Sequence, residues 1–254
     1  MRTLALLSTL SILALPACGN LNFYSDADLE PLSVQAYEEA SQQHQIITSG
    51  QRYELVQRVA RGITQAANRN YPWQARLLKA DNVPNAFCLP NGRIAIYTGI
   101  LEITKNADGL AAVMGHEVAH AILRHGGKRM TQSTLTALAS EALSEGLDMS
   151  EMDQDTHDLV ISAFGIGGEF LFTLPYSRDH ESEADIEGIR YAIRAGFDPW
   201  EAPKLWERMA KLGSSGPEWM STHPDPLNRA KRLREVIPRI IEEERNWRPS
   251  GVNQ

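Results

Sequence analysis

The sequence predicts an α+β fold that is predominantly helical, with one small β-sheet in the first half of the chain. Strand patterns are short and confined to residues 75–98, where apolar and polar residues alternate. Beyond residue 98 the apolar residues recur at helical spacing, interrupted by glycine and proline. No internal repeat is visible, so one compact domain is the expected architecture.

The composition is that of a folded globular protein, with 43% hydrophobic and 22% charged residues. The net charge of −7 argues against a nucleic-acid partner, because such a protein needs basic residues to neutralise phosphates. With 2 cysteines the chain cannot be a disulfide scaffold or hold a metal by cysteine alone. A bound metal would therefore need histidine and carboxylate ligands.

The N-terminus has the pattern of an export signal. A basic start precedes an uncharged run rich in leucine and alanine over residues 3–15, which is too short to span a membrane. The run ends in Leu-Pro-Ala-Cys at residues 15–18, which resembles the bacterial lipobox. We therefore expect residues 1–17 to be a lipoprotein signal peptide and Cys18 to carry the lipid. The alternative is a plain secretory leader followed by an incidental cysteine.

Residues 18–30 are polar and are expected to form a lipidated tether, followed by a single domain over residues 31–254. Lipidation of Cys18 would leave Cys88 without a disulfide partner. Gly19 stands where aspartate would favour retention in the inner membrane, by resemblance to the proteobacterial sorting rule. The expected location is the bacterial cell envelope, lipid-anchored in the outer membrane and facing the periplasm.

Two helices are expected before the sheet, over residues 31–47 and 51–68, because apolar residues recur three and four positions apart. Asn91 and Gly92 favour a two-residue hairpin turn between the last two strands, because both tolerate positive φ. Three strands are expected: residues 75–80, 85–90 and 93–98.

The rest of the chain is expected to be helical, with Gly126 and Gly127 forming the first break. Residues 145–158 carry several acidic residues and no basic one, which favours a solvated loop over a lid. The apolar residues 159–174 favour a buried helix over a lipid-facing surface. Six helices are expected: residues 107–124, 129–145, 156–174, 178–195, 200–212 and 226–244.

The helix expected over residues 107–124 contains three ionisable residues in an otherwise apolar segment. From residue 109 to 123 every residue is apolar or small except His116, Glu117 and His120. Buried ionisable groups cost several kcal/mol unless they are paired or bind a metal. The two histidines lie about 40° apart on a helix, so both can bind one ion, and Glu117 lies about 100° from His116. This pattern predicts a zinc site with Glu117 as the general base for a water molecule.

A second acidic helix begins near residue 178. Glu181 and Asp185 share one face, so Glu181 can be the third ligand and Asp185 can accept the free N–H of a ligand histidine. Glu183 is the rival ligand, and acidic residues at a helix start can simply complement the helix dipole. Spacing alone leaves these alternatives open.

Three motifs together resemble the M48 zinc metallopeptidases. They are Gly-His-Glu-Val-Ala-His at residues 115–120, Ser-Arg-x-x-Glu-x-Glu-Ala-Asp at 177–185, and His-Pro at 223–224 with an arginine at 229. The resemblance implies a zincin-like fold and favours Glu181 over Glu183 as the third ligand. The chain looks most like the small periplasmic lipoprotein members of that family.

Residues beyond the ligands are also indicated. Asn85, Ala86 and Phe87 resemble the family's strand beside the active-site cleft, which implies a substrate-binding strand. Peptide could add to this strand through its backbone. His223 or Arg229 could stabilise the negative charge that develops on a carbonyl oxygen. His223 could alternatively be a fourth metal ligand, as the resemblance suggests, or an ordinary loop residue.

The remaining histidines have no predicted role at the metal. His125 would fall on the opposite side of the helix from His116 if the helix continued, which favours a structural role. His44, His157 and His180 are expected at the surface.

The resemblance implies a zinc endopeptidase with one Zn²⁺ per chain that hydrolyses misfolded or unassembled envelope proteins. The alternative is a lipid-tethered periplasmic chaperone or assembly factor with a latched zinc site, that is, one closed by His223 as a fourth ligand. A purely structural site is closed by four protein ligands and needs no glutamate beside a ligand histidine, so the pattern favours the enzyme.

Overall fold

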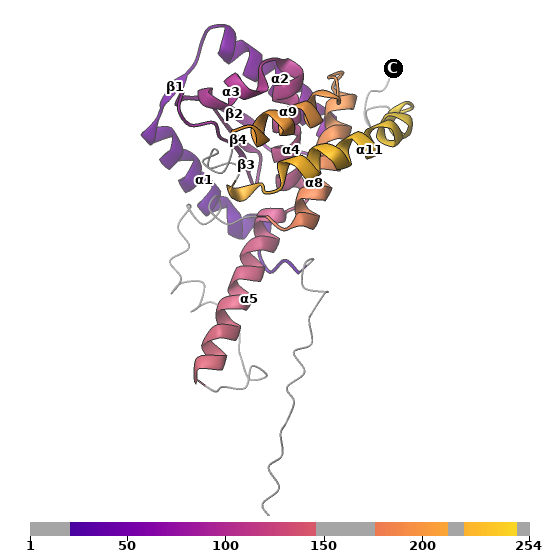
Figure 1. Ribbon diagram of the computed structural model, residues 1–254. Coiled ribbons are helices and arrows are strands. Elements are labelled where there is room, and N and C mark those ends of the chain that lie inside the picture. The colour runs from indigo at the N-terminus through magenta and orange to yellow at the C-terminus, as the bar shows by residue number, and fades with distance from the viewer. Residues whose placement is uncertain (1–20, 146–175, 213–220, 248–254) are drawn as a thin grey trace, which may run out of the picture.

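The computed structural model describes residues 21–145, 176–212 and 221–247. Within them a small sheet packs against helices, and α4 runs through the middle of the body (Figure 1). The signal peptide, Cys18 and the helix expected over residues 156–174 lie outside the described residues, as does the acidic segment from residue 146 on.

The sheet has four strands: β1 (Gln45–Ile47), β2 (Gln74–Lys79), β3 (Ala86–Leu89) and β4 (Arg93–Tyr97). Their order is β1-β2-β4-β3, with β2 and β4 parallel and the other two pairs antiparallel. The three expected strands are confirmed, with bounds that differ from the expected ones by at most one residue at each end. β3 lies at one edge of the described sheet, so one side of its backbone faces away from β4.

The strand β1 was not predicted, because residues 45–47 were assigned to the first helix. His44 has extended backbone angles, which ends that helix. The β-branched Ile46 and Ile47 then pair with β2 opposite Leu78 and Leu77. Tertiary pairing therefore outweighs the weak helical spacing at this point.

The predicted turn between β3 and β4 is one residue longer than expected. Leu89 pairs with Arg93, and the Gly92 N–H donates to the Leu89 carbonyl over 3.2 Å, so residues 90–92 form the loop. Asn91 and Gly92 have φ values of 67° and 85°, which agrees with the positive φ that the sequence predicted there.

Three helices precede α4: α1 (Asp26–Gln43), α2 (Gln51–Ala67) and α3 (Thr98–Thr104). Helix α1 starts within the segment predicted as a tether. Its start is fixed by a capping box, in which the Asp28 N–H donates to the Ser25 hydroxyl and the Ser25 N–H donates to the Asp28 carboxylate. Tyr24 and Leu29 are buried, so the folded part of the chain begins before residue 30.

The remaining described helices are α4 (Ala107–Ile122), α5 (His125–Glu145), α8 (Arg178–Arg194), α9 (Glu201–Ala210) and α11 (Pro226–Glu244). The break between α4 and α5 lies at residues 123–124, where Arg124 has a φ of 58°. The sequence placed this break at Gly126 and Gly127, but both lie in the first turn of α5. None of the described helices is long and apolar enough to cross a membrane.

Helices α4 and α8 approach each other closely through two glycines. A Cβ atom added to Gly115 would lie 2.8 Å from the Gly188 carbonyl oxygen, and one added to Gly188 would lie 2.8 Å from the His116 nitrogen. Both helices can therefore contribute side chains to one small buried site.

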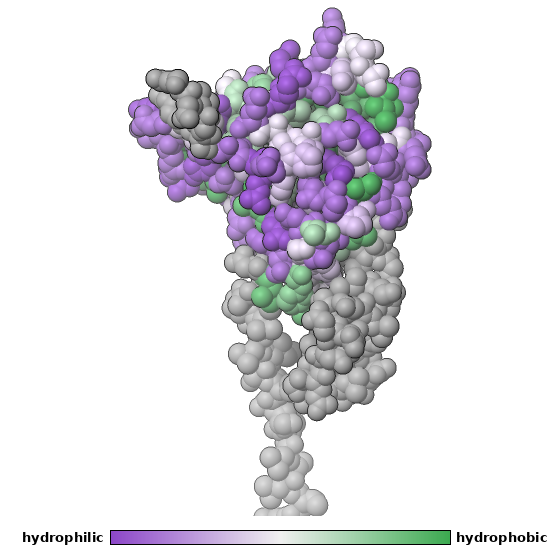
Figure 2. Space-filling view, turned by 180° about the vertical axis from the view of Figure 1, so that it is seen from behind, coloured by the Kyte–Doolittle hydropathy of each residue, from purple (hydrophilic) through white to green (hydrophobic). Residues whose placement is uncertain are grey.

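Helix α11 is held against α8 by buried and half-buried ion pairs. Glu244 accepts hydrogen bonds from Arg190 and Arg194, at 2.7–2.8 Å. Glu244 is itself buried, which strengthens the pairs relative to exposed ones. On the face opposite to the view of Figure 1, the described residues are mainly hydrophilic, and hydrophobic residues are visible only in small patches (Figure 2).

Candidate metal centre

Four buried side chains from three parts of the fold converge at one point. His116 and His120 come from α4, Glu181 comes from the first turn of α8, and His223 precedes α11. One possible ligand atom of each lies within 4.8 Å of the others. The exposed fraction of each residue is 3% or less.

The distances within this cluster fit a small tetrahedral ion. The Nε2 atoms of His116 and His120 are 3.0 Å apart, and the His223 Nδ1 is 3.2 Å from the His116 Nε2. The Glu181 Oε1 lies 3.0 Å from His223 Nδ1 and 3.3 Å from His120 Nε2. Four ligands at about 2.0–2.1 Å from one ion would lie about 3.3–3.4 Å from each other. The donor set and its spacing therefore suit a metal.

The pKa values of two members of this cluster are also shifted in the direction that favours metal binding. Burial opposes ionisation of Glu181, yet the Arg229 guanidinium and the neighbouring histidines hold the pKa of its carboxyl well below the usual value. Burial, reinforced by His116, lowers the pKa of His120 well below its usual value. An ionised carboxylate and neutral imidazoles are the protonation states that metal binding requires.

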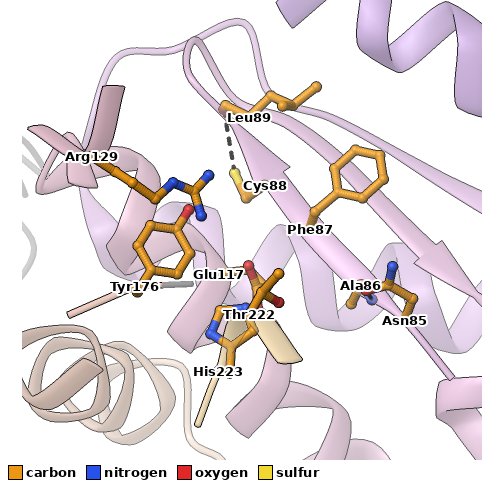
Figure 3. Close-up of a pocket in the computed structure, with 10 residues that line it drawn as sticks. All are labelled: Asn85, Ala86, Phe87, Cys88, Leu89, Glu117, Arg129, Tyr176, Thr222 and His223. Atoms are coloured by element: carbon orange, nitrogen blue, oxygen red, sulfur yellow. Dashed lines mark hydrogen bonds and ion pairs between the residues drawn. The ribbon is translucent and has the colours of Figure 1, made fainter. Parts of the chain in front are cut away.

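Glu117 lies beside the cluster rather than in it. It is buried, and its Oε1 lies 3.4 Å from the His223 Nε2. Its position at the edge of the ligand face of α4 is the one that helical geometry predicted. The carboxylate points into the cleft that Figure 3 shows, together with His223.

Asp185 and Arg229 support the ligands from behind. The Asp185 Oδ1 lies 3.2 Å from the His116 Nδ1, as expected for a residue that orients a ligand histidine. Arg229 pairs with both Glu181 and Asp185, and its guanidinium lies 3.4 Å from the centre of the Trp206 ring. Arg229 does not line the cleft. The sequence analysis proposed Arg229 as one of two candidates for oxyanion stabilisation. Its contacts place it on the side of the carboxylates away from the cleft.

Glu183, the rival ligand, is not part of the cluster. Its side chain is 49% exposed, and its Oε2 lies 3.0 Å from the His125 Nε2. His125 is fully buried, and its Nδ1 lies 2.9 Å from the His120 Nδ1. Burial, followed by the nearby His180 and Lys128, lowers the pKa of His125 to about 2.

The predicted positions of two histidines were wrong. His125 was expected on the far side of the α4 helix, but the break at Arg124 turns the chain and brings it back to His120. His180 was expected at the surface, but it is buried and stacks on His125 with ring centroids 4.3 Å apart. His44 is half-buried against Tyr97, and His157 lies outside the described residues.

A cleft connects the metal cluster with β3 (Figure 3). Asn85, Ala86 and Phe87, which the sequence assigned to substrate binding, lie along one of its walls. In antiparallel pairing, hydrogen-bonded and outward-facing residues alternate, and the Tyr97 N–H donates to the Asn85 carbonyl. The backbone of Ala86 and Cys88 therefore faces away from β4.

Tyr176 and Arg129 are among the cleft residues that were not predicted. Tyr176 stacks on His120 with ring centroids 3.9 Å apart, and the Arg129 guanidinium lies 4.0 Å from the centre of the Tyr176 ring. Burial raises the pKa of Tyr176 to about 12. Their positions in the sequence carry no local signal, since Tyr176 precedes α8 and Arg129 lies in α5. The cleft lining as a whole consists of Asn85, Ala86, Phe87, Cys88, Leu89, Glu117, Arg129, Tyr176, Thr222 and His223.

Residues 48–237 match the profile of peptidase family M48. The chain is 36% identical over 169 residues to the mitochondrial metalloendopeptidase OMA1 of Schizosaccharomyces pombe, covering 65% of this chain and 47% of that protein. It is 32% identical over 230 residues to the mitochondrial metalloendopeptidase OMA1 of Danio rerio, covering 85% of this chain and 47% of the relative.

A bacterial relative is the beta-barrel assembly-enhancing protease of Escherichia coli, which is 26% identical over 191 residues, covering 71% of this chain and 39% of that protein. The alignments span less than half the length of these relatives. The family match covers strands β2, β3 and β4, helices α4 and α8, residue His223 and most of α11, and so includes the whole buried cluster. The chain belongs to peptidase family M48.

Proposed function

We propose that this protein is a zinc-dependent endopeptidase. The observation that carries the proposal is the buried cluster of His116, His120, Glu181 and His223, with the Glu117 carboxylate beside it at the end of a cleft. Membership of peptidase family M48 supports a hydrolase. Nitrogen and carboxylate ligands at tetrahedral spacing suit Zn²⁺ better than a hard cation such as Mg²⁺.

Each residue has a distinct part in the proposed reaction. His116, His120 and Glu181 hold the ion, and Asp185 fixes the orientation of His116. A bound zinc ion would act as a Lewis acid, which polarises a carbonyl group and makes water more acidic.

Glu117 accepts a proton from the attacking water molecule while the oxygen of that water forms a bond to the carbonyl carbon. The same carboxyl group then donates this proton to the leaving amine nitrogen as the C–N bond breaks.

His223 has contacts on both of its ring nitrogens. Its Nδ1 belongs to the donor cluster, whereas its Nε2 faces Glu117. With His223 included, the cluster offers four protein ligands, which is the arrangement of a closed zinc site. This observation supports a second candidate function, a lipid-tethered chaperone or assembly factor with a latched zinc site.

For substrates we propose unfolded or misassembled envelope proteins, bound as an added strand along β3. The outward-facing backbone of Cys88 can pair with an extended peptide without recognising its side chains, and so can that of Ala86 once its N–H leaves the Asn85 Oδ1, to which it donates over 2.8 Å. Such a mode of binding suits clients of unrelated sequence. A relative in Escherichia coli is named a beta-barrel assembly-enhancing protease, which is consistent with this class of substrate.

For location we propose the bacterial cell envelope, with a lipid anchor at Cys18 in the outer membrane and the domain facing the periplasm. The support is the export pattern of residues 1–17 and the lipobox-like residues 15–18.

The decisive experiment compares the wild type with Glu117→Gln. The variant keeps the shape of the side chain but removes the base, so it should bind zinc like the wild type and cleave casein or an unfolded outer-membrane barrel about 10²–10⁴-fold more slowly. Zinc is measured by elemental analysis and cleavage by gel densitometry. Chelation should stop the wild type, and added Zn²⁺ should restore it.

Cleavage by Glu117→Gln at the wild-type rate would refute the proposed mechanism. A wild type that binds zinc and prevents client aggregation, but never cleaves, would instead support the latched chaperone.

A further inference from the structure

The ligand histidine His116 has the support that metal-bound histidines commonly have. Its Nε2 belongs to the donor cluster, and its Nδ1 lies 3.2 Å from the Asp185 carboxylate. Such a partner fixes which ring nitrogen carries the proton and how the ring is oriented. The second ligand histidine, His120, needs the same support, and no carboxylate lies at its Nδ1 among the described contacts.

The partner of His120 is another imidazole. Its Nδ1 faces the His125 Nδ1 over 2.9 Å, and the His125 Nε2 lies 3.0 Å from the Glu183 Oε2. The Glu183 carboxylate therefore reaches His120 through the ring of His125. Asp185 and Glu183 both belong to α8, so one helix supports both ligand histidines.

One arrangement of protons satisfies all of these contacts. His120 must have an unprotonated Nε2 to bind a metal, so its proton is on Nδ1. The His120 Nδ1–H then donates to the His125 Nδ1, which leaves the His125 proton on Nε2, where it donates to Glu183. In this series of hydrogen bonds from His120 through His125 to Glu183, each N–H donor meets an acceptor.

The surroundings of His125 hold its ring in place. The residue is fully buried, and His180 stacks on it with ring centroids 4.3 Å apart and planes 17° apart. The left-handed backbone of Arg124 turns the chain after α4 and directs His125 back toward the cluster. A ring fixed in this way can orient a neighbour, because it has little freedom of its own.

We propose that His125 is a positioning residue for the metal ligand His120, with Glu183 fixing His125 in turn. This inference rests on the proposed function, because it assigns a role in binding the zinc ion of that site. His125 belongs neither to the donor cluster nor to the cleft lining, so its effect is on the tautomer and orientation of His120.

The first test measures zinc affinity of the full chain by competition with a chromophoric chelator. His125→Leu removes the acceptor and should weaken zinc binding about 10–100-fold, the usual effect of losing such a partner. His125→Asn places an oxygen near the former Nδ1 and should recover most of the affinity. His125→Gln places its oxygen near the former Nε2 and should recover little. Circular dichroism of the metal-free proteins verifies folding.

The two amide variants keep the test decisive even if His125→Leu fails to fold. Equal zinc affinities for His125→Asn and His125→Gln, or a reversed order, would overturn the proposal. So would wild-type affinity in a folded His125→Leu.

The second test uses a matched pair on α8. Glu183→Ala should weaken zinc binding about 2–10-fold, less than loss of His125, because water can reach the exposed carboxylate site. Glu187→Ala, four residues further along, should leave zinc affinity unchanged, because Glu187 pairs with Arg190. Equal effects of the two substitutions would refute the role of Glu183.

The third test reads the tautomer directly. In ¹⁵N spectra of histidine-labelled, zinc-loaded wild type, His120 should carry its proton on Nδ1. A proton on Nε2 of His120 would overturn the arrangement. If the wild type binds no zinc, the proposed function fails; if it binds zinc and cleaves while the His125 variants match it, only this inference fails.

Discussion

Arg229 shows how a single residue can keep an acidic site charged. Its guanidinium pairs with Glu181 and Asp185 and lies over the ring of Trp206, all of them buried. Two carboxylates in such surroundings would otherwise resist ionisation together. Arg229 therefore acts on the metal ligands through charge, even though it is absent from the cleft.

A prediction at the same scale concerns the acidic residues of α8. Glu181→Ala removes a member of the donor cluster and should lower bound zinc by far more than Glu183→Ala, whose side chain lies outside the cluster. Elemental analysis after dialysis against a weak chelator measures the difference. The reverse ranking would make Glu183 the ligand and invalidate the alignment of this helix with the family.

At the scale of elements, the site depends on how closely α4 and α8 pack. The added Cβ atoms at Gly115 and Gly188 would meet backbone atoms, which cannot move away as a flexible side chain would. His116 follows Gly115 directly, and Glu181 lies on α8. The separation of the two helices therefore sets the spacing of the metal ligands.

We expect Gly188→Ala to push the helices apart. It should lower the free energy of unfolding of the metal-free protein by about 1–3 kcal/mol and weaken zinc binding as well. Gly126→Ala is the matched control, because nothing lies within 4 Å of its added Cβ; it should be neutral or stabilise by about 0.4–1 kcal/mol. Thermal and denaturant unfolding provide the measurement. Equal free energies of unfolding for the two variants would show that the close approach at Gly188 does not determine stability.

The edge strand β3 gives a second prediction about an element. Cys88→Pro removes an outward-facing N–H without removing a bond to β4, so it should weaken peptide binding while zinc content stays the same. Cys88→Ala removes the thiol but keeps the N–H and should bind peptide like the wild type. Fluorescence anisotropy of a labelled unfolded peptide, with both changes made in the inactive Glu117→Gln background, tests this. Similar affinities for both variants would place the substrate elsewhere.

At the scale of the whole molecule, the start of the folded chain is attached near α5. The Phe23 N–H donates to the Thr131 hydroxyl over 2.9 Å, and the Tyr24 hydroxyl lies 2.9 Å from that of Thr134. In Figure 1, α5 projects from the body on this side. A lipid on Cys18 would be joined to this part of the domain by only a few residues.

We expect Cys18→Ala to release the protein from membranes into the soluble periplasmic fraction, because the substitution removes the thiol that would carry the proposed lipid anchor. Fractionation and immunoblotting of cells that express each form measure this, and the folded domain should keep its zinc. If the variant still sediments with membranes, the apolar residues 159–174 become the candidate for a second attachment.

Local sequence patterns were sufficient to predict the fold class, the positions of most elements and the side chains that could hold a metal. His116, Glu117 and His120 could be assigned because helical spacing is local and fixes which side chains share a face. The same argument placed Glu181 and Asp185 together on one face of α8. Properties that depend only on neighbours within a few residues were thus predictable.

Which residues meet across elements depends on how the elements pack, and the sequence did not show it. The break at Arg124 brings His125 to His120, although an unbroken helix would have turned it away. The packing of α8 puts Glu181 in the cluster and Glu183 on His125, a choice that spacing left open. Helix α11 puts Arg229 behind the carboxylates. Most of these contacts join residues distant in the chain and follow from packing. The contact of His125 with the nearby His120 depends on the backbone break at Arg124, which local periodicity does not encode.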